Sequence, residues 1–191
     1  MPSASAPQKT PREKAIDSYN QGIRYRDKAW SIAEDLNGAT DKARTRLERK
    51  IAKQHKTSAA RFQRAISEVP EFPEAHAGLG YALRQAGDLN GSLAAYDEAI
   101  RLKPNYPEAI EYRAETYLAM GRIDDMRDAY SRLLTLDKAT ADKLLDAIKS
   151  FIENPPENYS PATLKTLATW AEERATLAQV VNPNRDQGNR W

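Results

Sequence analysis

Two consecutive stretches of equal length decide how this chain folds. They are PEAHAGLGYALRQAGDLNGSLAAYDEAIRLKPNY (73–106) and PEAIEYRAETYLAMGRIDDMRDAYSRLLTLDKAT (107–140). Both begin with Pro-Glu-Ala, both have glycine at the fifteenth place (Gly87, Gly121), and both have tyrosine at the twenty-fourth (Tyr96, Tyr130). An internal repeat of this length is typical of proteins that stack helical hairpins into an array.

Each unit has the pattern of two helices. In the first unit the apolar residues recur at helical spacing in two runs, which are Leu79 and Leu83, then Leu93, Tyr96, Ala99 and Ile100. Gly87 stands between the runs, where a left-handed residue closes a helix. Asp88 and Asp124 are predicted as caps or first-turn acids of the second helices. Pro104 ends the second helix and starts the next unit.

The segment HAGLGYALRQAGDL (76–89) poses a choice between a phosphate-binding loop and a helix. A dinucleotide-binding loop needs G-x-G-x-x-G after a strand, whereas GLGYAL has Leu83 at the sixth place and lies within a helical period. The sequence also lacks a Gly-x4-Gly-Lys-Ser/Thr motif. We therefore interpret these glycines as packing and capping residues. His76 is predicted to be a packed histidine with one nitrogen hydrogen-bonded.

These two units resemble the tetratricopeptide repeat, with apolar or small residues at places 4, 7, 8, 11, 20, 24 and 27 and proline at place 32. In the first unit these places hold His76, Leu79, Gly80, Leu83, Ser92, Tyr96, Ala99 and Pro104; in the second they hold Ile110, Arg113, Ala114, Tyr117, Met126, Tyr130, Leu133 and Lys138. His76 and Ser92 depart from the pattern, as do Arg113 and Lys138. The whole chain is more loosely similar to repeat proteins of bacteria.

The flanking segments extend the array. An apolar pattern without glycine or proline from residue 43 to 69 predicts one long helix, and the stripe over residues 16–36, ended by Asn37-Gly38, predicts its partner. The predicted fold is therefore all-α, a short right-handed array of helical hairpins. Its parts are a flexible leader (1–12), a long basic hairpin that is an extended first repeat (13–72), two repeats (73–106 and 107–140), capping helices (141–181) and a flexible tail (182–191).

Composition excludes several classes of protein. Without cysteine, the chain has no disulfide, thiolate metal site or cysteine nucleophile. No apolar run approaches the roughly 18 residues of a transmembrane helix, and the start lacks the apolar stretch of a secretory signal. We expect a soluble protein, either cytoplasmic or, if a signal peptide has been removed, periplasmic. The net charge is +7 over residues 1–70 and −4 over residues 71–136.

No constellation of residues predicts catalysis, a cofactor or a metal. The two histidines lie in different helices, and without cysteine they make a zinc site improbable. His76 has no evident nucleophile or orienting group beside it. His55 stands among Lys53, Gln54 and Lys56, and we expect it on a solvated face. We therefore predict that the protein is not an enzyme.

The resemblance implies a groove lined by the first helices of the repeats, at places 2, 5, 9, 12 and 13. Of the residues at these places, we expect Glu74, Tyr81, Arg84, Gln85, Glu108, Glu111, Glu115 and Leu118 to bind a partner. Glu108, Glu111 and Glu115 share a helical face, which suits an extended or helical segment with basic and apolar residues. The Lys and Asn that grip a terminal carboxylate in some relatives are absent. The alternative is that the acids only keep the surface soluble.

The basic helix offers a second surface. Between residues 41 and 64 there are nine Lys or Arg and two acids, and Lys42, Arg46, Arg49, Lys50, Lys53 and Lys56 lie largely off the apolar stripe. They form either an ordinary solvated face or a site for an anionic partner, such as an acidic protein, phospholipid headgroups or nucleic acid. No aromatic residue is interleaved, which disfavours single-strand stacking. Nucleic acid is thus possible but less favoured than a protein partner, and self-association through the hairpin is a third possibility.

Overall fold

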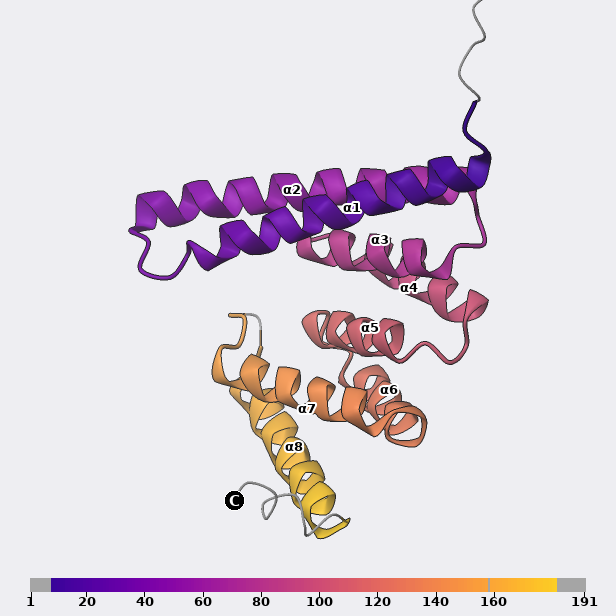
Figure 1. Cartoon of the computed structure of the whole chain (residues 1–191). Helices are drawn as coiled ribbons and strands as arrows, with labels where there is room; N and C mark the ends of the chain where they lie inside the picture. The colour runs from indigo at the N-terminus through magenta and orange to yellow at the C-terminus, as the bar shows by residue number, and fades with distance from the viewer. Residues whose placement is uncertain (1–7, 158, 182–191) are drawn as a thin grey trace, which may run out of the picture.

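The computed structural model describes residues 8–157 and 159–181, and the backbone of these residues forms helices, turns and loops without strands. The helices are α1 (Pro11–Glu34), α2 (Asp41–Glu68), α3 (Pro73–Gln85), α4 (Leu89–Leu102), α5 (Pro107–Ala119), α6 (Ile123–Leu136), α7 (Lys138–Glu153) and α8 (Pro161–Val181). They pair as antiparallel hairpins that stack one after another (Figure 1). The all-α array of hairpins predicted from the repeat is therefore confirmed.

The first hairpin is longer than the others and projects past α3 at its α1–α2 turn (Figure 1). A capping box starts α1, because the Thr10 hydroxyl accepts from the Glu13 amide while the Glu13 carboxylate accepts from the Thr10 amide. Gly38 turns the chain with φ at +76°, a conformation that favours glycine. Further along, the Ser58 hydroxyl donates to the Gly22 carbonyl at 2.8 Å and ties the two helices together.

Two glycines of α3 admit large rings from neighbouring helices. A Cβ built on Gly78 would lie 2.7 Å from ring carbons of Phe62 in α2, and one on Gly80 would lie 2.8 Å from the ring of Tyr96 in α4. Both rings are buried, so a side chain at either glycine would push helices apart. Gly87 has φ at +88° and closes α3. These glycines pack and cap, as predicted from the sequence.

The two regular repeats have matching helices, with α3 and α5 of one length and α4 and α6 of another. Tyr96 and Tyr130, the shared tyrosines, are 0% and 1% exposed and belong to one continuous core. The repeats differ at the N-cap of their second helix. The Asp88 carboxylate accepts from the Gly91 amide at 2.9 Å, whereas Arg122, at the start of α6, makes no side-chain cap.

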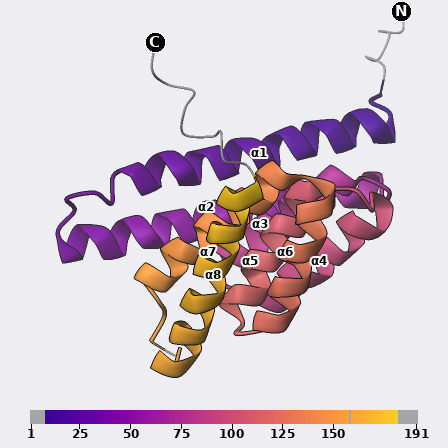
Figure 2. The same ribbon diagram turned by 90° about the horizontal axis from the view of Figure 1, so that it is seen from below.

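The last pair of helices covers the end of the array. Figure 1 places α8 at the end remote from the long hairpin, and Figure 2 shows it beside α7. Ser160 caps α8 by accepting from the Thr163 amide at 3.1 Å. The Trp170 ring of α8 meets the Tyr130 ring of α6 edge-on, with centroids 5.2 Å apart. Thus α8 packs on α7 and contacts α6 through Trp170.

Two predictions about the chain ends concern residues whose structure is only partly described. Residues 1–7 of the predicted leader and the whole predicted tail, 182–191, lie outside the described residues. Of the leader's remainder, Thr10 caps α1, and Pro11 and Arg12 already belong to the helix.

Candidate functional site

A small pocket of about 100 Å³ opens on the face formed by the first helices of the hairpins. Helices α1, α3 and α5 supply its walls, the turn before α5 supplies Tyr106, and α2 supplies one ring, Phe62. The lining residues are Tyr19, Ile23, Arg26, Trp30, Phe62, Glu74, Ala77, Gly78, Tyr81, Tyr106, Glu108, Ala109 and Tyr112. Ala77 and Gly78 of α3 and Ala109 of α5 have little or no side chain, which leaves the space open. Aromatic rings and the carboxylates of Glu74 and Glu108 surround it.

The rings form a connected cluster. The Trp30 indole N–H donates to the Tyr81 hydroxyl at 2.6 Å, and the two rings meet edge-on with centroids 5.9 Å apart. Tyr81 also meets Tyr112 edge-on at 5.7 Å. Trp30 nevertheless remains 45% exposed. The cluster thus spans three hairpins and presents an apolar ring to solvent at the edge of the pocket.

Two arginines of the chain lie against rings of this cluster. The Arg26 guanidinium lies over the Trp30 ring, 4.4 Å from its centroid. Arg84 forms an ion pair with Glu115 at 2.9 Å and lies 5.7 Å from the centroid of Tyr81. Glu108 is exposed and forms no ion pair within the described part of the chain. The site therefore combines rings that attract cations with a free carboxylate at its edge.

Glu111 stands out among the acids because it is only 7% exposed. Burial, together with the nearby Glu115 and Glu108, raises the pKa of its carboxyl to about 7, while Lys143 and Arg84 partly oppose the rise. Near neutral pH this carboxyl is therefore charged in part of the molecules and neutral in the rest. It is a poorly solvated acceptor that a cation brought close to it would stabilise in the charged form.

We expect Glu111 to make folding depend on pH. The pKa of Glu111 is raised from its ordinary value of 4.5. Its contribution to the free energy of unfolding is therefore fully present below about pH 4.5 and is lost as the pH rises through 7. Ionisation in the folded chain costs roughly 3 kcal/mol. Glu111→Gln should therefore match the parent at pH 4 and exceed its unfolding free energy at pH 8 by about 3 kcal/mol.

Urea unfolding at the two pH values measures this difference. Glu172→Gln, at an exposed position of α8, is the control and should show no such change with pH. A parent and Glu111→Gln variant that differ equally at both pH values would contradict the assignment of the titrating group to Glu111.

The predicted groove residues are only partly brought together. Glu74, Tyr81 and Glu108 line the pocket. Arg84 and Glu115 pair beside it, Glu111 is buried, Gln85 is exposed at the end of α3, and Leu118 is 3% exposed with its carbonyl accepting from the Tyr159 hydroxyl. The Leu118 side chain is therefore almost inaccessible to a partner. The groove assignment itself stays a prediction.

Sequence reasoning missed the aromatic walls. Tyr19, Arg26 and Trp30 come from α1, which is outside the 34-residue register and so could not be placed by counting. Tyr112 stands next to Glu111 at a place not assigned to the groove, and Tyr106 precedes α5. The one available signal was the density of tyrosine and tryptophan on α1 itself, in YNQGIRYRDKAW (19–30).

The prediction for His55 was wrong. Its side chain is 2% exposed and faces α3, with its ring 5.9 Å from that of Tyr81. Burial, helped by Arg84, lowers the pKa of the imidazole, and Nδ1 has no hydrogen-bond partner in the described structure. The flanking lysines point outward because one residue along a helix turns the side chain by about 100°.

The second histidine, His76, is half-buried, with Nε2 2.9 Å from the Pro70 carbonyl oxygen.

Two kinds of site find no support in the structure. Residues 8–157 and 159–181 contain no group of three or more histidines and carboxylates that could hold a metal ion. Among the helices described, none is long and apolar enough to span a bilayer.

Comparison with known proteins supports the repeat found in the sequence. A family model described as a TPR repeat matches residues 80–121, which cover the last six residues of α3, all of α4 and α5 and the turn after α5. A crystal structure of the MamA protein has a similar fold, with a TM-score of 0.55 and 16% identity over 94% of this chain and 97% of that chain. No curated protein matches the sequence. Residues 80–121 therefore match the tetratricopeptide repeat, and the chain as a whole has a fold similar to that of the MamA protein.

Proposed function

We propose that the protein is a non-enzymatic scaffold that binds a segment of a partner protein on the face formed by α1, α3, α5 and α7. Tetratricopeptide repeats generally mediate interactions between proteins, which supports a protein as the partner. The observation that carries the proposal is the aromatic pocket with Glu74 and Glu108 at its lining. It lies where the first helices of successive hairpins meet, and it is the kind of concave site that recognises a protruding side chain.

The chemistry of the pocket favours a basic side chain. Ring faces of tyrosine and tryptophan attract ammonium and guanidinium groups, and each such contact contributes about 0.5–2 kcal/mol depending on how far it is desolvated. The carboxylates of Glu74 and Glu108 add charge attraction. A volume of about 100 Å³ has room for the end of one lysine or arginine side chain. The exposed Trp30 ring beside it suits an apolar residue of the same segment.

Neighbouring acids extend the same preference toward α7. Glu111 and Glu115 follow Glu108 along α5 at helical spacing, and Arg84 neutralises only Glu115 directly. A second basic residue of the segment, placed near Glu111, would hold that carboxyl in its charged form. We expect the preferred segment to carry basic residues and at least one apolar residue.

Selection from a display library of random short peptides tests the proposal. We expect peptides enriched in Lys or Arg with an aromatic or aliphatic neighbour. Glu108→Gln and Tyr112→Leu should each weaken the best peptide about tenfold, as the loss of one charge-assisted or cation–ring contact implies. Glu172→Gln, an exposed acid on α8, is the matched control and should leave affinity unchanged.

Two outcomes would reject the proposal. One is a set of selected peptides without basic residues. The other is binding that survives both pocket substitutions while circular dichroism shows the variants to be folded. Glu108 suits the test better than the buried Glu111, because a change at an exposed residue leaves the core intact.

A further inference from the structure

The first half of α2 carries a set of cations that the rest of the molecule does not neutralise. Lys42, Arg46, Arg49, Lys50 and Lys53 form what we name the basic ridge, and all five are exposed. Across residues 8–157 and 159–181, ion pairs occur on or between the other helices, yet none involves a cation of α2. The ridge is therefore an uncompensated positive surface.

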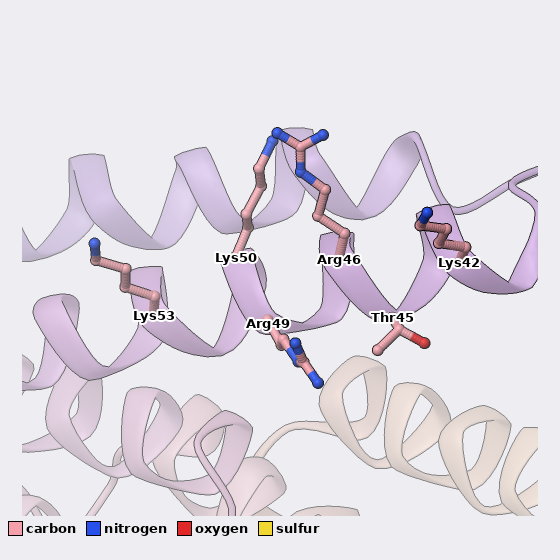
Figure 3. A pocket seen from close by; sticks show the side chains of 6 residues that line it. All are labelled: Lys42, Thr45, Arg46, Arg49, Lys50 and Lys53. Carbon is pink, nitrogen blue, oxygen red and sulfur yellow. The ribbon is translucent and has the colours of Figure 1, made fainter.

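The side chains of the ridge surround a shared hollow. Their stems, with Thr45, line an open depression of about 580 Å³ on the surface of α2. Figure 3 shows Arg46 and Lys50 extending to one edge of this face of the helix, with Arg49 and Thr45 extending to the other edge. At 1.5 Å per residue, the ridge is about 17 Å long. It offers several head groups to one extended anion rather than a single charge.

The position of the ridge leaves it accessible. This part of α2 belongs to the portion of the hairpin that projects past α3, and α1 is its packing partner there (Figure 1). Leu47 and Ile51, the apolar residues among the cations, are half-buried; residues 41–56 include no Phe, Trp or Tyr, and the ring of His55 is buried. Thus the ridge has no apolar anchor for a protein interface core or a bilayer, and no ring on which a free base would stack.

We propose that the basic ridge binds the phosphate backbone of a nucleic-acid duplex without reading its sequence. The two arginines suit phosphate, because a guanidinium donates two parallel hydrogen bonds to such oxygens. One helix fills a major groove about 12 Å wide. Since α2 is packed along α1, the hairpin is too broad to enter, so its contacts stay on the backbone. This surface is separate from the aromatic pocket, and either proposal stands without the other.

Fluorescence anisotropy with two labelled DNA duplexes of unrelated sequence measures this binding. If five cations each neutralise one phosphate, the logarithm of the association constant should fall against the logarithm of salt with a slope near −4.5, a roughly 500-fold loss between 50 and 200 mM. The two duplexes should bind equally. The triple variant Arg46→Gln, Lys50→Gln, Lys53→Gln should bind more weakly at low salt, with a slope near −1.8.

A variant with the same change of charge controls for net charge alone. Arg12→Gln, Lys14→Gln and Lys165→Gln remove three exposed cations from α1 and α8 and should leave the slope unchanged. All six positions are exposed and glutamine is a good helix former, so both variants should fold. Binding that survives the ridge substitutions, or that is lost equally in the control, overturns the proposal. So does binding to anionic phosphatidylserine vesicles with no binding to either duplex.

Discussion

Replacing Phe62 by alanine is expected to lower the free energy of unfolding by about 3–5 kcal/mol. The ring is 1% exposed and belongs to α2, yet it lies against glycines of two other helices. A Cβ on Gly22 of α1 or on Gly78 of α3 would each come within 2.7 Å of it. The ring therefore fills the junction of the long hairpin with the first regular repeat, and its loss opens a cavity shared by three helices.

Urea unfolding followed by circular dichroism measures the loss. Phe72→Ala is the matched control, because that ring is half-buried and should cost clearly less. Phe62→Leu, which keeps part of the volume, should fall between the parent and Phe62→Ala. A Phe62→Ala variant within 1 kcal/mol of the parent would show that the three helices close over the missing ring, contrary to the packing described.

Replacing Leu167 by alanine is expected to cost about 2–5 kcal/mol, the second largest effect. Leu167 is 0% exposed and joins α8 to the continuous core that runs back through the repeats. In a stacked array each element contacts only its neighbours, so the last pair of helices depends on this apolar contact to cover the end. The loss should therefore appear first as fraying of α8 and α7.

Thermal and urea unfolding of Leu167→Ala measure the effect. Leu177→Ala on the same helix is the control: Leu177 is 52% exposed, so its truncation should change stability by less than about 0.5 kcal/mol. Equal stabilities of the two variants would contradict a capping role for α8. Hydrogen exchange would locate the fraying, with amides of α8 losing protection before those of α3 and α4.

The repeat itself was predictable because its signals are local. Gly87 and Gly121 closed helices where the pattern placed them, with φ at +88° and +74°, since a left-handed position favours glycine whatever surrounds it. Asp88 capped its helix for a similarly local reason, because a cap bonds to an amide three residues away. The α2 helix, Asp41–Glu68, closely follows the apolar pattern over residues 43–69.

The candidate site was less predictable. Counting places within a repeat found Glu74, Tyr81 and Glu108, which line the pocket, but it also included Leu118, which is 3% exposed. The count assumes that every place on a face is equally open. Tyr159, from the turn before α8, contacts the Leu118 carbonyl, and no spacing within α5 indicates that contact.

By itself, the sequence determined the all-α repeat, the turns and caps, and the separation of a basic front from an acidic middle, because these depend on neighbours within a few residues. Only the tertiary structure decided that the Trp30 indole donates a hydrogen bond to Tyr81, that His55 is buried, and that the pKa of Glu111 rises to about 7. Each of these depends on residues brought close from other helices. Burial and charge act through space, and the stacking of hairpins sets which side chains share that space.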